Sequence, residues 1–177
     1  MSAAAGWSQV AGCGRAGFKG PGALAWLASQ GLPAPSIANS WIAWPAGQGV
    51  IARLGSSEFF IEAAPGAIAG VDAALAASPA GVYPVLRHDA AYLLEGAGAH
   101  DVLAQVCNVN FSALDLAGAP IVMTLMIGVA VLVLPEAAGE GRRYRVWCDP
   151  SYGEYLHHEL SAIISPGLFP RTTGAQT

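Results

Sequence analysis

The sequence predicts a single α+β domain of two duplicated halves, with antiparallel strands and packed helices. The chain has 177 residues, the length of one ordinary domain, and 54% of them are hydrophobic. Candidate strands follow one another through short turns, without the crossover helices that parallel strand pairs require. Two helices entered through glycine segments lie 76 residues apart, with Leu27 and Leu103 at matching positions, which indicates an internal duplication.

In the first half, the glycine-rich segment 17–22 leads into a short helix that ends at Gly31 and Pro33. Leu24, Leu27 and Ala28 are expected on its buried face. Three strand candidates rich in β-branched and aromatic residues follow, at 40–44, 50–54 and 58–63. A helix over 66–77 then presents its apolar face through Ile68, Val71 and Leu75.

The second half repeats this order of elements. A strand is predicted at 85–95, and the segment Gly96-Ala97-Gly98 enters a helix whose inner face is Val102, Leu103 and Val106. Strand candidates follow at 121–127, 129–134 and 144–148. Asp149 and Pro150 then start a last helix. Helical spacing predicts that its buried side carries Tyr152, Tyr155, Leu156, Leu160 and Ile163.

These elements divide the chain into three parts. Residues 1–16 are expected to form an N-terminal arm, residues 17–164 the folded domain, and residues 165–177 a C-terminal tail that is flexible or docked on a partner. The segment 10–13 mimics a lipoprotein cleavage site but lacks the basic and apolar regions of a signal peptide. The most apolar run, 121–134, is too short for a membrane-spanning helix. We therefore expect a cytoplasmic protein without a membrane partner.

Charged residues make up only 11% of the chain, under half of the usual ~25%. The net charge is −4 and no basic tract is present, which excludes nucleic acid as a partner. A folded monomer of 18.0 kDa exposes roughly 8,000 Å² of surface to solvent. The chain therefore has, on average, one charged residue for about every 400 Å² of surface. This sparse charge predicts an obligate subunit whose exterior is partly covered by a partner. A GC-rich genome that favours alanine and glycine is the alternative explanation.

Two motifs suggest ligand sites, and their context disfavours both. Residues 12–17 spell G-x-G-x-x-G, but no acidic residue occurs before Glu58 to hold a ribose, and no clear strand and helix flank the motif. In the last helix, adjacent His157 and His158 point about 100° apart, so they cannot easily bind one ion, although Glu154 and His158 share a face. No metal site is predicted.

A nucleophilic site is equally poorly supported. Cys107 could be combined with His88 or His100 and an aspartate, Asp89 or Asp101, but it closes an apolar helix, where cysteine is usually buried. No catalytic residue is therefore predicted. Among the aromatic side chains, Trp41 and Trp44 are candidates for a partner interface or for ordinary core positions. Tyr152 and Tyr155 are further interface candidates on the last helix.

Three segments carry a resemblance to a known family. They are RLGSSEFFI at 53–61, the glycine-entered helix and apolar loop at 96–111, and RVWCDPSYGEYL at 145–156. In this order they resemble the signature, central helix and closing strand of the gamma subunit of bacterial heterotetrameric sarcosine oxidase, and the resemblance covers about residues 17–164. Ser56 and Ser57 replace the Pro-Asp of that signature.

The resemblance implies a fold similar to the folate-binding domain of aminomethyltransferases such as the glycine-cleavage T-protein. It implies a small non-catalytic subunit that binds no cofactor by itself. Larger catalytic partners would carry FAD, FMN, NAD and tetrahydrofolate and would demethylate an N-methyl amine by oxidation. The equivalent subunit of N-methylglutamate dehydrogenase or of dimethylamine monooxygenase is an alternative.

A second alternative is an aminomethyltransferase-like enzyme that itself binds folate and handles one-carbon units. Such a site needs an acid to hold the polar edge of the pterin. Glu95 and Asp89 are the candidates for that acid in the second half.

Overall fold

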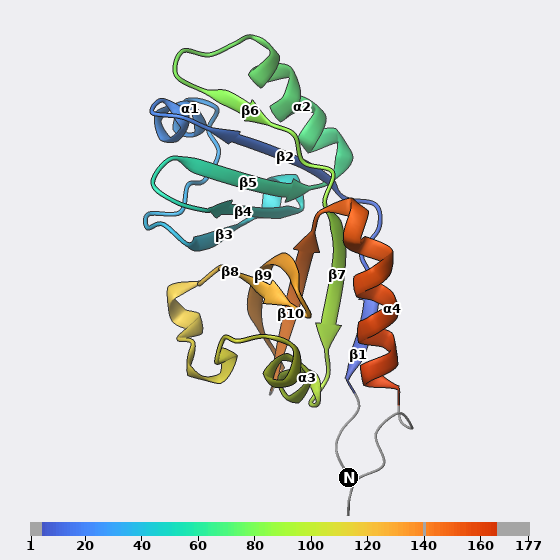
Figure 1. The fold of residues 1–177 in the computed structure, drawn as a ribbon. Helices are drawn as coiled ribbons and strands as arrows, with labels where there is room; N and C mark the ends of the chain where they lie inside the picture. Colours follow the sequence, from blue (N-terminus) through green and yellow to red (C-terminus); the bar gives the residue numbers. More distant parts are fainter. Residues whose placement is uncertain (1–4, 140, 166–177) are drawn as a thin grey trace, which may run out of the picture.

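The computed structural model describes residues 5–139 and 141–165 and contains two five-stranded antiparallel sheets and four α-helices (Figure 1). The first sheet has the order β3-β4-β5-β2-β6, and the second has the order β1-β7-β10-β9-β8. The strands of the first sheet are β2 (Gly14–Lys19), β3 (Ser40–Trp44), β4 (Gly49–Arg53), β5 (Glu58–Ala63) and β6 (Tyr83–Val85). Those of the second are β1 (Gly6–Gln9), β7 (Ala90–Glu95), β8 (Val122–Met126), β9 (Val129–Ala138) and β10 (Gly141–Cys148). The helices are α1 (Ala23–Ser29), α2 (Pro65–Ala76), α3 (Ala99–Val106) and α4 (Gly153–Ile164).

The two sheets are copies of one pattern, which confirms the predicted α+β fold with antiparallel strands. Strands β2 and β7 begin 76 residues apart, as do helices α1 and α3. Read from β3 and from β8, the two sheet orders match strand for strand. The strand that precedes each half pairs within the other half, because β1 pairs with β7 and β6 pairs with β2. This reciprocal exchange ties the halves together.

The exchange of strands explains two differences from the sequence predictions. Residues 6–9, expected within an N-terminal arm, form β1, and Trp7 stacks on Tyr92 at 4.7 Å between ring centroids. The strand predicted at 85–95 is interrupted, because Val85 belongs to the first sheet and Ala90 to the second, so residues 86–89 cross between them. Except for Ser165, the predicted tail at 165–177 lies outside the described residues.

The buried faces of α2 and α3 agree with the sequence prediction, and that of α1 agrees in part. In α2, Ile68, Val71 and Leu75 are buried as predicted, and in α3 Val102, Leu103 and Val106 are buried as predicted. In α1 the prediction was wrong in part, because Ala23, Trp26 and Leu27 are buried whereas Leu24 is 40% exposed and Ala28 is exposed.

The prediction that Tyr152 and Tyr155 line the buried side of the last helix was also wrong. These side chains are 53% and 48% exposed, while Leu156 and Leu160 are fully buried. Gly153 sets this rotation, because a Cβ there would lie 3.0 Å from Tyr92 Oη and from the Cβ of Ala90. The close approach turns the 153–156–160 face toward the second sheet, and the tyrosines point away.

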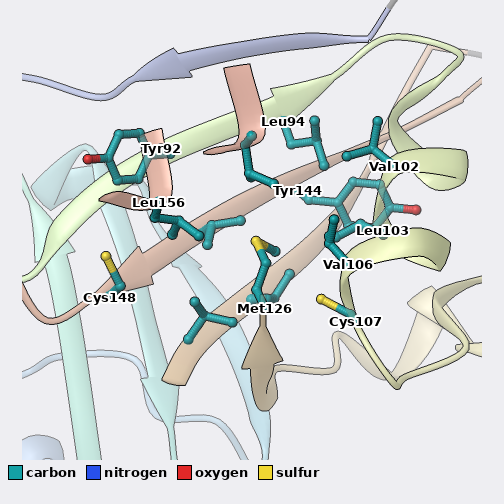
Figure 2. Close-up of a cluster of buried hydrophobic side chains, with 14 of the residues drawn as sticks. Tyr92, Leu94, Val102, Leu103, Val106, Cys107, Met126, Tyr144, Cys148 and Leu156 are labelled. Atoms are coloured by element: carbon teal, nitrogen blue, oxygen red, sulfur yellow. The ribbon is translucent and has the colours of Figure 1, made fainter. Parts of the chain in front are cut away.

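Each half has its own apolar core. The core of the second half joins its sheet to α3 and α4 and is shown in Figure 2, where the labelled Tyr92, Leu103, Met126, Tyr144 and Leu156 converge. A matching cluster in the first half packs α1 and α2 on their sheet. No helix of the described residues is long and apolar enough to cross a membrane.

Candidate functional site

The seam between the two halves is filled by side chains. Val50, Ala52 and Phe60 from the first sheet meet Ala91, Ile121, Leu134 and Trp147 from the second half, and all seven are buried. The Phe60 and Trp147 rings pack edge to face, with centroids 5.1 Å apart. The centre of the molecule is therefore a third core rather than a binding channel.

A buried carboxylate joins the halves at this seam. Glu62 on β5 is fully buried and accepts hydrogen bonds from Arg15 Nε at 2.8 Å, from Arg145 Nη1 at 2.9 Å and from the indole N–H of Trp147. Arg15 comes from the same sheet as Glu62, whereas Arg145 and Trp147 come from β10. Buried charges are tolerated only when they are paired and hydrogen-bonded, and Glu62 meets both conditions.

Beside the seam, the two halves leave an open groove of about 420 Å³. This volume lies within the range of ligand-binding clefts. The linker 86–89 forms one wall, and Leu54 and Glu58 come from the first half. The rest of the lining comes from β8, from β9, from the last two residues of β10 and from the segment that follows β10: Met123, Thr124, Ala130, Val131, Leu132, Trp147, Cys148, Asp149 and Pro150.

The charged side chains of the groove make specific contacts. Arg87 donates to Glu58 Oε1 at 3.0 Å and lies 3.8 Å from Asp89 Oδ1, and its guanidinium lies over the Phe60 ring. Asp149 accepts hydrogen bonds from the hydroxyl and the backbone N–H of Ser151, which lower the pKa of its carboxyl. Among the described residues, three carboxylates and one arginine line the groove, so this lining has an excess of negative charge.

The two buried thiols remain protonated at neutral pH. Cys148, in the groove wall, has its pKa raised to about 11 by burial and further by the charges of Asp89 and Asp149. Burial alone raises the pKa of Cys107 to about 11. A thiol attacks as the thiolate, so both cysteines have the character of core residues.

The structure places the histidine and glycine motifs in ordinary surroundings. His158 is 81% exposed and lies 3.2 Å from Glu159, while His157 stacks on Tyr92. Within residues 5–139 and 141–165, no cluster of three His, Cys, Asp or Glu side chains is arranged to hold a metal ion. Residues 14–17 of the G-x-G-x-x-G segment run along β2, so the motif does not open a helix.

The four predicted interface residues lie in two separate regions of the chain, on β3 and around the start of α4. Trp41 packs against the seam core, and Trp44 lies with Trp26 in another groove, between α1 and α2, whose described lining residues carry no charge. Tyr152, just before α4, and Tyr155, in its first turn, are half exposed. Figure 1 shows α4 and β3 on different sides of the molecule. These four side chains therefore do not form one continuous surface.

Comparisons with known proteins give matches among solved structures. No protein-family model and no curated protein matches the chain. A chain of the heterotetrameric sarcosine oxidase from Corynebacterium sp. U-96, in complex with pyrrole 2-carboxylate, aligns with a TM-score of 0.69 and 21% identity. The alignment covers 93% of this chain and 88% of that chain. The two chains share one fold.

The same fold occurs in the glycine cleavage system aminomethyltransferase T from Bartonella henselae, with a TM-score of 0.65 and 13% identity. That alignment covers 89% of this chain but 45% of the aminomethyltransferase, so this chain spans less than half of that protein. The expected similarity to heterotetrameric sarcosine oxidase and to the aminomethyltransferases is thus confirmed at the level of the fold.

The sequence did not point to the Glu62 cluster or to the groove. A signal for the cluster was present in β5, because Glu62 follows the apolar run Phe59-Phe60-Ile61 in a chain with few charges. Nothing in the sequence indicated that residues from β5 and β10 meet, since that contact depends on how the two sheets pack.

Proposed function

We propose that this chain is a small, non-catalytic subunit of a multi-subunit complex that oxidises N-methyl amines, similar to heterotetrameric sarcosine oxidase. In this proposal the chain braces larger cytoplasmic subunits that carry FAD, FMN, NAD and tetrahydrofolate, and it binds none of these cofactors itself. The alternative within this proposal is the equivalent subunit of N-methylglutamate dehydrogenase or of dimethylamine monooxygenase, and in each case the larger partners would decide the substrate.

One observation carries the proposal. The alignment with one chain of a heterotetrameric oxidase covers almost the whole length of both chains. The alignment with the aminomethyltransferase covers less than half of that protein. A protein of this length and fold is therefore found as one chain of an oligomeric oxidase.

The surface supports the same proposal. Several large apolar side chains are exposed, among them Ile37 at 59%, Tyr83 at 59% and Leu86 at 81%, on a chain with only 11% charged residues. Such surfaces are typical of permanent interfaces. The reactive groups of the groove are also engaged, because Arg87 holds Glu58 and Asp89 and the Cys148 thiol is protonated.

The proposal is tested by purifying a tagged copy of the full chain from its native cells. Mass spectrometry identifies the co-purifying chains, and the visible absorbance of the eluate reports bound flavin. We expect larger flavin-bearing chains in fixed stoichiometry, and their sequences will identify the substrate class. A colourless eluate that contains this chain alone contradicts the proposal.

A folate-binding enzyme is the second candidate, and the position of Asp89 favours it. Of the two acids considered from the sequence, Asp89 lies in the groove, whereas Glu95 is exposed at the end of β7. His88 and Thr124 add polar groups to the same lining. The ion pair with Arg87 opposes this function, because a pterin would have to compete for the Asp89 carboxylate.

Titration with tetrahydrofolate decides between the two candidates. Trp147 in the groove wall provides a fluorescence signal. Saturable quenching that is lost in Asp89→Asn supports the enzyme, and the absence of saturable quenching supports the non-catalytic subunit.

A further inference from the structure

We propose that the groove beside the linker 86–89 is the docking site for an extended segment of a larger partner subunit. The segment presents an apolar side chain next to a lysine or arginine. This inference rests on the proposed function, because it assigns a surface to the partner that the proposed function requires.

The apolar part of the site is formed by two exposed side chains at the groove. Leu86 is 81% exposed and Met123 is 55% exposed, and they line the groove from the linker and from β8. Large apolar side chains that gather at one groove are the usual centre of a protein interface. A partner segment that lies in the groove would cover both.

The duplication provides an internal comparison for Leu86. The residue 76 positions earlier, Val10, occupies the matching place in the linker between β1 and β2. Val10 is partly buried against the seam core, and its N–H donates to the carbonyl of Ala91. The fold therefore covers the apolar residue in one copy of this linker, while in the other copy the described residues leave Leu86 exposed.

The backbone of the linker favours an extended partner segment. Residues 86–89 lie between β6 and β7 and outside both sheets, so they pair with no strand of the described chain. Backbone groups that pair with no strand can hydrogen-bond to an extended peptide, as they do at an exposed sheet edge, and the peptide then places alternate side chains in neighbouring pockets.

The negative charge of the groove is the reason why the partner segment is expected to carry a lysine or arginine. In the described part of the chain, the groove lining contains the carboxylates of Glu58, Asp89 and Asp149 and the guanidinium of Arg87, and Glu58 retains 38% side-chain exposure. Charge complementarity selects partners and steers their approach. A lysine or arginine beside the apolar anchor would balance this excess negative charge.

The test compares three single variants of the tagged full chain in native cells: Leu86→Glu, Met123→Glu and the control Leu125→Glu. Leu125 lies two residues after Met123 on β8 and is equally exposed, at 54%, but it does not line the groove. We expect the first two variants to retain at least about ten-fold less of the larger chains than the wild type does. We expect the control to retain them fully, and circular dichroism checks that all three fold.

A photo-crosslinking residue in place of Leu86 identifies what occupies the groove. The expected product joins this chain to a larger subunit, at a peptide with an apolar residue next to lysine or arginine. A crosslink to a second copy of this chain, or to a peptide without a basic residue, overturns the inference.

The outcomes separate this inference from the proposed function. If the wild-type chain retains no larger subunit, the proposed function fails and the docking site fails with it. If the wild type retains larger subunits and Leu86→Glu and Met123→Glu behave like Leu125→Glu, only the docking site is wrong.

Discussion

Replacing Glu62 by glutamine removes the charge that neutralises two arginines at the seam. The carboxylate is fully buried and contacts Arg15 Nε at 2.8 Å and Arg145 Nη1 at 2.9 Å. Removing one partner of a buried ion pair costs about 3–5 kcal/mol. The arginine side chains keep 13% and 22% exposure and can reach water, so we expect the lower end of that range, about 3 kcal/mol.

Urea unfolding followed by pulse proteolysis at low protein concentration measures this loss without interference from aggregation. With a slope of about 2 kcal/mol per molar urea, the midpoint should fall by about 1.5 M. The control is Glu136→Gln, which removes a 2.6 Å ion pair with Arg143, a side chain that is 42% exposed. We expect that control to lose less than about 1 kcal/mol. Equal midpoints for Glu62→Gln and Glu136→Gln would refute the role of Glu62 as the link between the halves.

Further predictions concern the thiols, pH, two glycines and solubility. A thiol reagent should modify only Cys13 in the folded protein and all three cysteines in urea, because Cys107 and Cys148 are buried. The free energy of unfolding should fall as the pH rises from 9 toward 11, because unfolded thiols lose their protons near pH 9 whereas the pKa values of the folded ones are raised to about 11. The decline should be shallower in Cys107→Ala. Gly153→Ala should destabilise the protein by about 1–3 kcal/mol, because its Cβ would meet Ala90 and Tyr92 at 3.0 Å. Gly70→Ala on α2, with nothing within 4 Å of the added Cβ, should stabilise it by about 0.4–1 kcal/mol in thermal unfolding. Expressed alone, the chain should be recovered mostly in the insoluble fraction, and co-expression with its partners should make it soluble; a concentrated soluble monomer would contradict its sparse surface charge.

Most of the local structure could be predicted from the sequence because it depends on local patterns. Strands β3 and β5 were placed at 40–44 and 58–63, and the structure has them at Ser40–Trp44 and Glu58–Ala63. The buried faces of α2 and α3 followed from their apolar spacing. The duplication was visible because the two glycine-entered helices keep a spacing of 76 residues, and the structure has α1 and α3 at that spacing.

What could not be predicted depends on contacts between distant segments. The face that α4 buries is set by the approach of Gly153 to Tyr92. The spacing of apolar residues along the helix does not reveal this contact. The break at 86–89 exists because a strand of each half pairs with the sheet of the other half. The apolar pattern of a strand does not show which of the two sheets the strand joins. The groove and the pairing of Glu62 with Arg145 arise from the same packing of the halves.

Native mass spectrometry of the protein purified through a tag on this chain tests the central claim most directly. The account predicts one dominant assembly in which this 18.0 kDa chain is bound to larger chains at a fixed ratio, with bound flavin adding to the mass. A dominant species at the mass of the single chain, from cells that also express the larger chains, would contradict it.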